Sequence, residues 1–244
     1  MLNIRENALH LIMPYVTVNL LSRVFCLGQN GKICGTGFAV EIDGEQYLVT
    51  ANHVAKASQY KPQILMEGWD STFNWKTIGK DEDNDVAVLA ADRQLCPPTE
   101  IQIETGKITF GQTGYALGFP MDYGTDIFGR LEPEGDAPSY PMPMAAPTTF
   151  YGGGNPRYYW GSVAIGFSGG PVVFPTWPDP SRPTTPLSSG NWAITGVVIG
   201  YAKRQFEIDK DGALWPEVNL SYEQPVGMVK VADKSVFMEL IRAC

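Results

Sequence analysis

A serine placed between glycines is the segment of this sequence best suited to covalent chemistry. Ser168 lies in Gly166-Phe167-Ser168-Gly169-Gly170-Pro171. Glycine has no β-carbon, so a substrate carbonyl can approach the backbone closely, and the chain can adopt dihedral angles that aim two N–H groups at one spot. Such donors stabilise the oxyanion that forms when a hydroxyl attacks a carbonyl. We therefore expect Ser168 to be a nucleophile beside an oxyanion hole.

The nucleophile requires a base, because a serine hydroxyl is unreactive near neutral pH. The chain has two histidines, His10 and His53, and both precede Ser168. The segment Gly166–Gly170 also fits the G-x-S-x-G pattern of α/β-hydrolases, but their histidine follows the serine. The order therefore favours a histidine, aspartate, serine arrangement. His53 ends a β-rich run after an Asp43-Gly44 turn, whereas His10 lies in a mixed stretch where a surface imidazole is the simpler interpretation.

A carboxylate should orient the histidine. Asp85 directly precedes the apolar run Val86-Ala87-Val88-Leu89, which has the composition of a strand. Asp81, Glu82 and Asp83 compete on composition, but they come earlier and are typical of a solvated turn. We choose Asp85.

Five short blocks, in this order along the chain, are Gly35-Thr36-Gly37-Phe38, Thr50-Ala51-Asn52-His53, Asp85-Val86-Ala87-Val88-Leu89, Ala116-Leu117-Gly118-Phe119-Pro120 and Gly166-Phe167-Ser168-Gly169-Gly170-Pro171. They resemble the blocks of trypsin-like serine proteases, and are closer to the bacterial HtrA type than to digestive trypsins. The segment from Val231 to Ala243 resembles the helix that closes that fold.

The resemblance implies an all-β fold of two antiparallel six-stranded β-barrels of the chymotrypsin type, followed by a C-terminal helix. It places His53 and Asp85 on the first barrel and Ser168 on the second, with the cleft between them. It implies a serine endopeptidase in which Asp85 orients His53, His53 takes the proton of Ser168, and Ser168 attacks the peptide carbonyl. Backbone amides of Gly166 and Ser168 would form the oxyanion hole.

Specificity follows from the same resemblance. In the family, the residue six before the nucleophile lies at the base of the pocket for the side chain that precedes the cut. Here this residue is Ser162, followed by Val163, and the pocket offers no carboxylate for Lys or Arg, so we expect cleavage after small or medium apolar residues. The expected edge for an extended substrate is formed by Gly196, Val198, Ile199 and Gly200.

Two residues depart from the family pattern. Asn52 replaces a small apolar residue beside the histidine. Phe167 replaces the Asp that pairs with a newly cleaved N-terminus in digestive relatives. Regulation, if present, is therefore expected through a protein partner, an assembly or loop ordering. No PDZ-like segment follows the expected closing helix, which predicts a bare catalytic domain.

The elements that must position these residues divide into two halves. Short β-rich runs with frequent turn residues recur through residues 1–104 and again through 105–244. A closing helix is expected over 233–243, with Asp233 as its cap. Two Pro- and Gly-rich insertions, 120–161 and 174–191, lack strand alternation. The first, rich in aromatic residues, is either a substrate-binding rim or lid or an ordered surface loop.

Composition limits the remaining alternatives. A chain of 244 residues with 44% hydrophobic residues can bury a substantial core. The net charge of −8 disfavours nucleic-acid and anionic-membrane partners, and the family resemblance implies a peptide or protein substrate. The stretch Ala8 to Leu21 is too short to span a bilayer and lacks signal-peptide features, which favours the cytoplasm.

Four cysteines are too few for a disulfide framework. Cys26 and Cys34 flank a turn and are either two reduced thiols or a hairpin disulfide. We expect no metal and no cofactor, since the histidines and cysteines have no ligand spacing. The functional alternatives are a catalytically silent trypsin-like fold that binds peptides or acts as a scaffold, and an esterase that uses the same triad.

Overall fold

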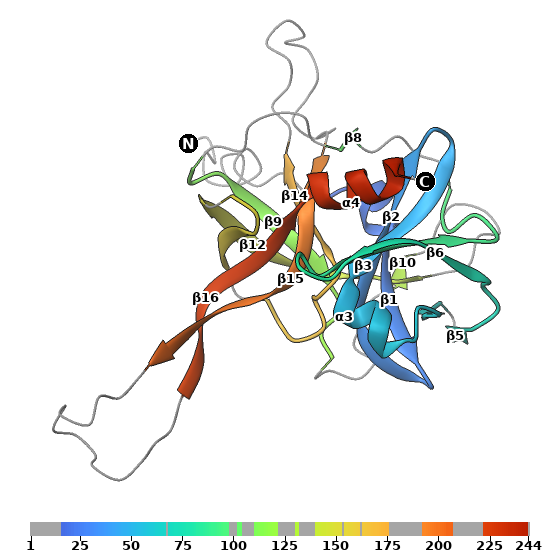
Figure 1. The fold of residues 1–244 in the computed structure, drawn as a ribbon, viewed down its shortest axis with the longest axis horizontal. Helices are drawn as coiled ribbons and strands as arrows, with labels where there is room; N and C mark the ends of the chain where they lie inside the picture. The colour runs from blue at the N-terminus through green and yellow to red at the C-terminus, as the bar shows by residue number, and fades with distance from the viewer. Residues whose placement is uncertain are drawn as a thin grey trace, which may run out of the picture.

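The computed structural model describes residues 16–66, 68–97, 102–103, 110–121, 130–131, 140–152, 154–161, 163–175, 192–206 and 222–243. These residues form two antiparallel β-sheets that lie side by side, with short helices at their margins (Figure 1). The helices are α2 (Val18–Leu21), α3 (Asn52–Ala57) and α4 (Lys234–Arg242).

The first sheet comes from the first part of the chain. Its strands are β1 (Val24–Gln29), β2 (Lys32–Ile42), β3 (Glu45–Ala51), β4 (Gln63–Leu65), β5 (Trp69–Asp70), β6 (Trp75–Asp81) and β7 (Val86–Ala91), paired in the order β5-β4-β1-β2-β3-β7-β6. The Asn30-Gly31 and Asp43-Gly44 turns have φ of 52°, 75°, 54° and 81°. Positive φ at both residues is what a tight two-residue hairpin turn requires.

The second sheet closes into a barrel. It contains β9 (Thr113–Gly118), β12 (Met144–Gly152), β13 (Arg157–Gly161), β14 (Pro171–Pro175), β15 (Trp192–Phe206) and β16 (Tyr222–Asp233). β14 pairs with both β9 and β15, which joins these six strands into a ring. β8 (Gln102–Ile103) adds to β15 in parallel, and β10 (Arg130–Leu131) pairs with β11 (Tyr140–Pro141). The predicted all-β fold class is confirmed, and the first sheet has a seventh strand because β5 extends it beyond β4.

One sequence-based expectation is wrong. The segment 120–161, interpreted from the sequence as a long insertion without strand alternation, contains β12 and β13, which pair with each other and belong to the closed ring. Their burial alternates only in part, because both strands expose aromatic side chains, and this weakens the strand pattern in the sequence. Within 174–191, residues 174 and 175 end β14, and residues 176–191 lie outside the described part.

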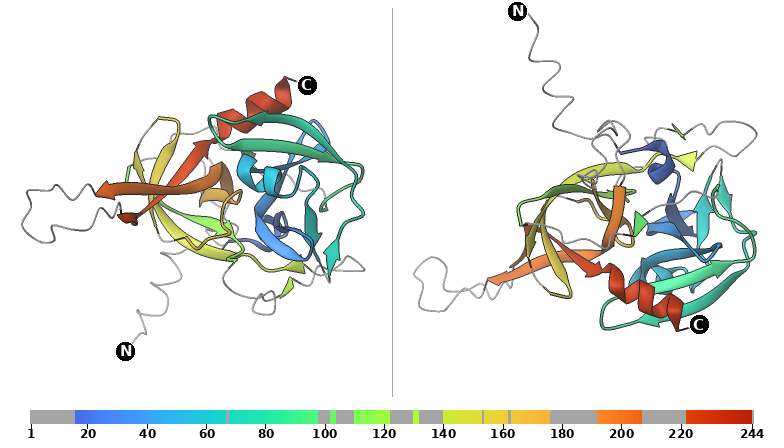
Figure 2. Two further views of the ribbon diagram at one scale, coloured as in Figure 1. Left: turned by 60° about the horizontal axis from the view of Figure 1, so that its bottom comes forward. Right: turned by 90° about the horizontal axis from the view of Figure 1, so that it is seen from above.

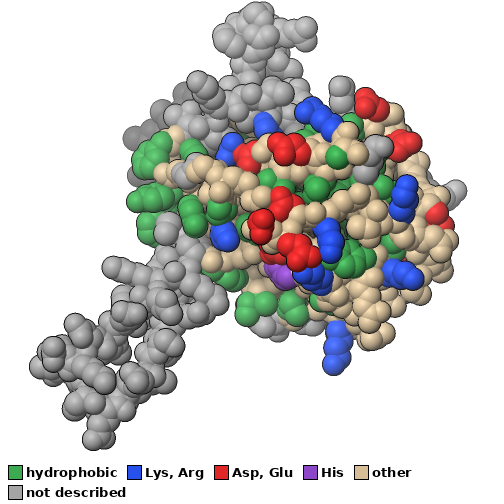
Figure 3. All heavy atoms as spheres, viewed as in Figure 1, with side chains coloured by type: hydrophobic (Ala, Val, Ile, Leu, Met, Phe, Trp, Pro, Cys, Tyr) green, Lys and Arg blue, Asp and Glu red, His purple; other side chains and the backbone are tan. Residues whose placement is uncertain are grey.

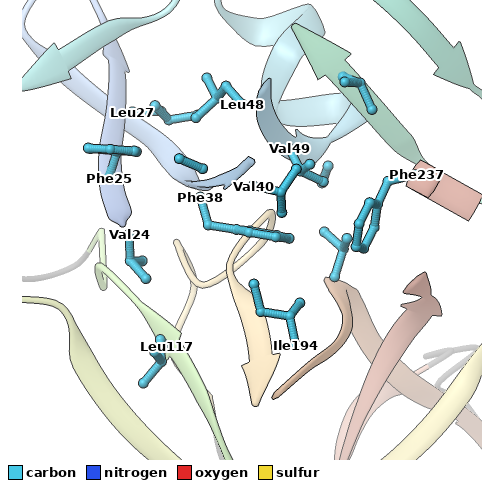
Figure 4. Close-up of a cluster of buried hydrophobic side chains, with 14 of the residues drawn as sticks. Val24, Phe25, Leu27, Phe38, Val40, Leu48, Val49, Leu117, Ile194 and Phe237 are labelled. Atoms are coloured by element: carbon cyan, nitrogen blue, oxygen red, sulfur yellow. The ribbon is translucent and has the colours of Figure 1, made fainter. Parts of the chain in front are cut away.

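Helix α4 confirms the expected closing helix. The Asp233 side chain accepts a hydrogen bond from the Ser235 amide, as an N-cap does. Val236, Phe237 and Ile241 are buried, and α4 packs against β6 and β7 of the first sheet. Phe237 meets Phe38 edge to face at 5.9 Å, in a core that also includes Leu117 and Ile194 of the second barrel (Figure 4).

The surfaces of the two halves differ. On the face shown in Figure 3, acidic and basic side chains are mixed over the first sheet, whereas hydrophobic side chains gather over the second barrel. The exposed hydrophobic residues there include Phe110, Met144, Tyr151 and Trp160. Beyond the ring, β15 and β16 continue as a two-stranded ribbon that projects from the body (Figures 1 and 2).

The cysteines in the described ranges are free thiols. Cys26 lies opposite Thr36 in the β1–β2 hairpin, which places Cys34 diagonally across from it. Burial raises the pKa of the Cys26 thiol well above its ordinary value and that of Cys96 to about 11. Both thiols therefore stay protonated near neutral pH. Among the helices described here, none is long and apolar enough to cross a membrane.

Candidate active site

His53 stands on the first turn of α3, directly after β3. The end of β3 is fully buried between β2 and β7, which fixes where the helix begins. The His53 side chain is half-exposed. The sequence correctly indicated a strand that delivers the histidine, although the residue itself begins a short helix.

Asp85 reaches His53 through both carboxylate oxygens. Oδ2 lies 2.6 Å from His53 Nδ1, and Oδ1 accepts a hydrogen bond from the His53 amide at 2.9 Å. The carbonyl of Asp85 also accepts from the Asn52 amide. These contacts fix the imidazole relative to its own backbone and leave Nε2 as the outward nitrogen.

The loop before Asp85 is held by its own hydrogen bonds. Asp81 accepts from the backbone and side-chain amides of Asn84 at 2.9 and 2.7 Å. Although partial burial acts in the opposite direction, these bonds lower the pKa of Asp81, so it remains ionised near neutral pH. Asp85 itself has φ of 55°, an uncommon conformation for a residue other than glycine. The loop therefore imposes the backbone angle that turns the carboxylate toward His53.

Asn52 does not disturb the packing beside the histidine. Its side chain is buried, and its Oδ1 accepts a hydrogen bond from the Tyr60 hydroxyl at 3.0 Å. A buried amide with a partner is not a destabilising group. The departure from the family pattern at this position is thus accommodated locally.

The turn around Ser168 is shaped by glycines. Gly166 and Gly169 have φ of 106° and 87°. A β-carbon on Gly169 would lie 2.0 Å from the carbonyl oxygen of Thr36, and one on Gly170 would lie 2.0 Å from that of Leu117. The backbone at these positions is therefore in direct contact with its surroundings, and only glycine fits.

One peptide orientation bears on the expected oxyanion hole. The carbonyl of Ile165 accepts a hydrogen bond from the Met121 amide at 2.7 Å. Because a trans peptide is planar, the Gly166 N–H of the same unit points the opposite way. Over the described residues, the structure records no hydrogen bond from the amides of Gly166 or Ser168. The Gly166 amide therefore faces away from Met121.

Thr36 of β2 ties the Ser168 turn to the first sheet. Its side chain is fully buried, donates to the Gly166 carbonyl at 2.7 Å and accepts from the Phe119 amide at 3.0 Å. Its amide donates to the Ser168 carbonyl at 2.9 Å. The sequence placed Thr36 in a family block but gave no sign of this role, since its partners lie far away along the chain.

The two halves meet at this turn. A β-carbon on Gly169 would also lie 2.9 Å from the amide of Ala51, the residue that precedes α3. The nucleophile turn is therefore packed against the start of the helix that carries His53. Between the described His53 ring and Ser168 hydroxyl, no hydrogen bond is recorded, and such bonds are often long before substrate binds.

The structure describes most, but not all, of the residues that are expected to bind substrate. Ser162 lies outside the described residues, and Val163 is buried. Val198 donates to the Gly170 carbonyl and accepts from the Gly169 amide, and Gly196 pairs with both Val172 and Asp233. These two residues are therefore satisfied inside the barrel. The substrate edge over 196–200 stays a prediction.

Phe167 contributes by packing. It is buried in the second barrel, and a β-carbon on Gly118 would lie 2.7 Å from its ring. The glycine in the Ala116–Pro120 block thus makes room for the aromatic ring beside the nucleophile.

Known proteins share the motifs and the fold described above. The model of the trypsin-like peptidase domain family matches residues 35–177, a range that contains His53, Asp85 and Ser168. The serine protease Do-like HtrA of Lactobacillus helveticus is 34% identical over 98 residues, which cover 38% of this chain and only 23% of that protein.

Two solved structures share the fold. An inactive mutant form of Rv3671c from M. tuberculosis H37Rv has a TM-score of 0.51 at 17% identity, covering 96% of this chain and 91% of that chain. The serine endoprotease from Yersinia pestis has a TM-score of 0.54 at 17% identity, covering 94% and 68%.

Proposed function

The chain belongs to the trypsin-like peptidase domain family and is a serine protease, and we propose that it is an endopeptidase whose catalytic triad is Asp85, His53 and Ser168. The observation that carries the proposal is the 2.6 Å contact between His53 Nδ1 and Asp85 Oδ2. It supports an imidazole whose other nitrogen is free to act as a base toward a hydroxyl.

The reaction would proceed by acyl transfer. His53 Nε2 takes the hydroxyl proton of Ser168 as Ser168 Oγ bonds to the peptide carbonyl carbon. His53 then returns that proton to the leaving amine as the C–N bond breaks, and water releases the acyl group by the reverse route. The amides of Gly166 and Ser168 stabilise the oxyanion, each by roughly 10²- to 10³-fold in rate.

The substrate is a peptide or protein cut after a small or medium apolar residue. Support comes from the buried apolar Val163 and from Ile165 and Met121, which are exposed apolar residues beside Gly166. No carboxylate occurs from Ser162 to Ile165 to attract Lys or Arg.

Activation does not require a charged N-terminus in this proposal. Phe167 supports the Ser168 turn through apolar packing against Gly118, at the position where an ion pair acts in digestive relatives. Equal activity of the whole chain and a chain that begins at residue 16 would support this, and loss of activity on trimming would contradict it. An activating protein partner remains part of the proposal.

The proposal includes a cytoplasmic location for the protein. The adjacent thiols of Cys26 and Cys34 are free, as expected in a reducing compartment. Fractionation of cells that express the chain with a C-terminal tag tests this directly.

Labelling with a small fluorophosphonate tests the triad without knowledge of the substrate. We expect one adduct by intact mass on the native chain and none on Ser168→Ala or His53→Ala. A folded native chain that gives no adduct would instead support a catalytically silent peptide-binding fold. Cleavage of esters but of no peptide library would support the esterase alternative.

A further inference from the structure

Two backbone segments lie beside the Ser168 turn. One is 163–166, which leads into the nucleophile turn, and the other is 199–201 on β15. β15 is fixed against the turn just before this second segment, because Val198 makes backbone hydrogen bonds with Gly169 and Gly170 at 2.7 and 2.8 Å. A side chain that precedes the cut would enter between these segments.

Tyr201 bridges the two segments. Its hydroxyl donates a hydrogen bond to the Val163 carbonyl at 2.6 Å. The ring is half-buried and packs against the cluster of buried hydrophobic residues in the second barrel, as Ala164 does. The Tyr201 side chain therefore joins β15 to the segment 163–166.

The neighbouring position on β15 is open. A β-carbon on Gly200 would meet no atom within 4 Å. The register with β16 shifts between Val198 and Gly200, so Ile199 is passed over in the pairing. The strand thus leaves room for a substrate main chain at Gly200, while the Tyr201 ring packs toward the cluster of buried residues in the second barrel.

We propose that Tyr201 closes the pocket and restricts the residue before the cut to Gly or Ala. This inference rests on the proposed endopeptidase function and narrows its substrate class. A larger side chain would have to displace the ring and break its part-buried hydrogen bond to Val163. The expected discrimination is roughly 10- to 200-fold between small and large side chains.

Peptidyl diphenyl phosphonates measure this discrimination at the nucleophile itself. Ser168 Oγ bonds to phosphorus, the bond from phosphorus to one phenoxy oxygen breaks, and the phenol leaves with the hydroxyl proton. The rate is followed by intact mass for probes that carry Ala or Phe at the residue before phosphorus. The native chain should react at least 10-fold faster with the Ala probe.

Two truncations test the assignment to Tyr201. We expect Tyr201→Ala and Tyr201→Val to raise the Phe-to-Ala rate ratio by at least 10-fold, and valine keeps β-propensity if alanine destabilises the strand. Tyr151→Ala is the matched control, because Tyr151 is an exposed tyrosine of β12, and its ratio should equal the native one. Thermal melting monitors folding.

The outcomes separate the two proposals. Equal rates of the native chain with both probes, or an unchanged ratio in a folded Tyr201 variant, would overturn the role of Tyr201 alone, provided that the fluorophosphonate labels Ser168. No labelling by the fluorophosphonate would overturn the proposed function, and the Tyr201 assignment with it.

Discussion

The first half of the molecule orients its candidate base through side-chain contacts, whereas the second half shapes its candidate nucleophile through backbone. Asp85 holds His53 with both carboxylate oxygens. The turn around Ser168 is fixed by main-chain hydrogen bonds and by glycines that lie against neighbouring carbonyls. Thr36 combines both means, because its hydroxyl and its amide both reach the second half.

This difference predicts different sensitivities. Changing the carboxylate that orients His53 should alter the chemistry and leave the fold intact. Adding even one β-carbon at Gly169 or Gly170 should disturb the fold locally, because the space there is filled by backbone that cannot rotate away. The following variants are arranged to break or sharpen this contrast.

Asp85→Asn should have the largest effect on rate. The amide keeps the shape but favours the wrong imidazole tautomer, so we expect a loss of about 10⁴-fold in the rate of peptide cleavage. The melting temperature should change little. Asp83→Asn is the control, because Asp83 is an exposed residue of the same loop. A loss below 10-fold for Asp85→Asn would contradict the assigned role.

Gly169→Ala should damage both fold and rate. The alanine faces an unfavourable φ of 87° and a carbonyl oxygen at 2.0 Å. Gly111→Ala isolates the first cost, since Gly111 has φ of 80° and no atom within 4 Å of its β-carbon position. We expect about 1–2 kcal/mol for Gly111→Ala from the dihedral angle, and about 1–3 kcal/mol more for Gly169→Ala from overpacking.

Chemical denaturation measures both glycine variants, and fluorophosphonate labelling measures the nucleophile. A shift of about 1 Å at the turn is enough for roughly a 10²-fold loss in labelling rate. Equal stability and equal labelling of the two variants would show that the turn has room to adapt.

Thr36→Val should weaken the connection between the halves. Valine keeps the shape but removes the donor to Gly166 and the acceptor for Phe119, at a cost of about 1–3 kcal/mol in the free energy of unfolding. Labelling of Ser168 should slow as well. Thr113→Val is the control, because Thr113 is exposed and its change should stay within about 0.5 kcal/mol. Equal stability of the two variants would contradict the role of Thr36.

The same contrast explains what the sequence could reveal. Local patterns are sufficient for the Asp43-Gly44 hairpin, the Asp233 cap and the glycines around Ser168, since each depends on neighbours along the chain. Contacts between distant residues are not encoded locally. Thr36 and Gly166 are separated by 130 positions, and Tyr201 and Val163 by 38. The sequence pattern does not predict β12 and β13, because their exposed aromatic residues obscure the alternation of apolar and polar residues.

Asn155→Ala should have the smallest effect, but it tests a second link between the halves. Asn155 donates to the Asn84 side chain at 2.8 Å and accepts from the Asp233 amide at 3.2 Å. Since one of these bonds is exposed and the other only part-buried, we expect a loss of about 0.5–1 kcal/mol in the free energy of unfolding.

The rate distinguishes a link to the active site from a simple surface contact. Asn84 precedes Asp85, so freeing it should slow Ser168 labelling, by less than 10-fold. Asn74→Ala removes the exposed side-chain hydrogen bond to Asp92 within the first half alone, and should leave labelling unchanged. If both variants label at the native rate, the position of Asp85 depends on its own loop alone. The side-chain contacts that orient His53 in the first half are then independent of the second half.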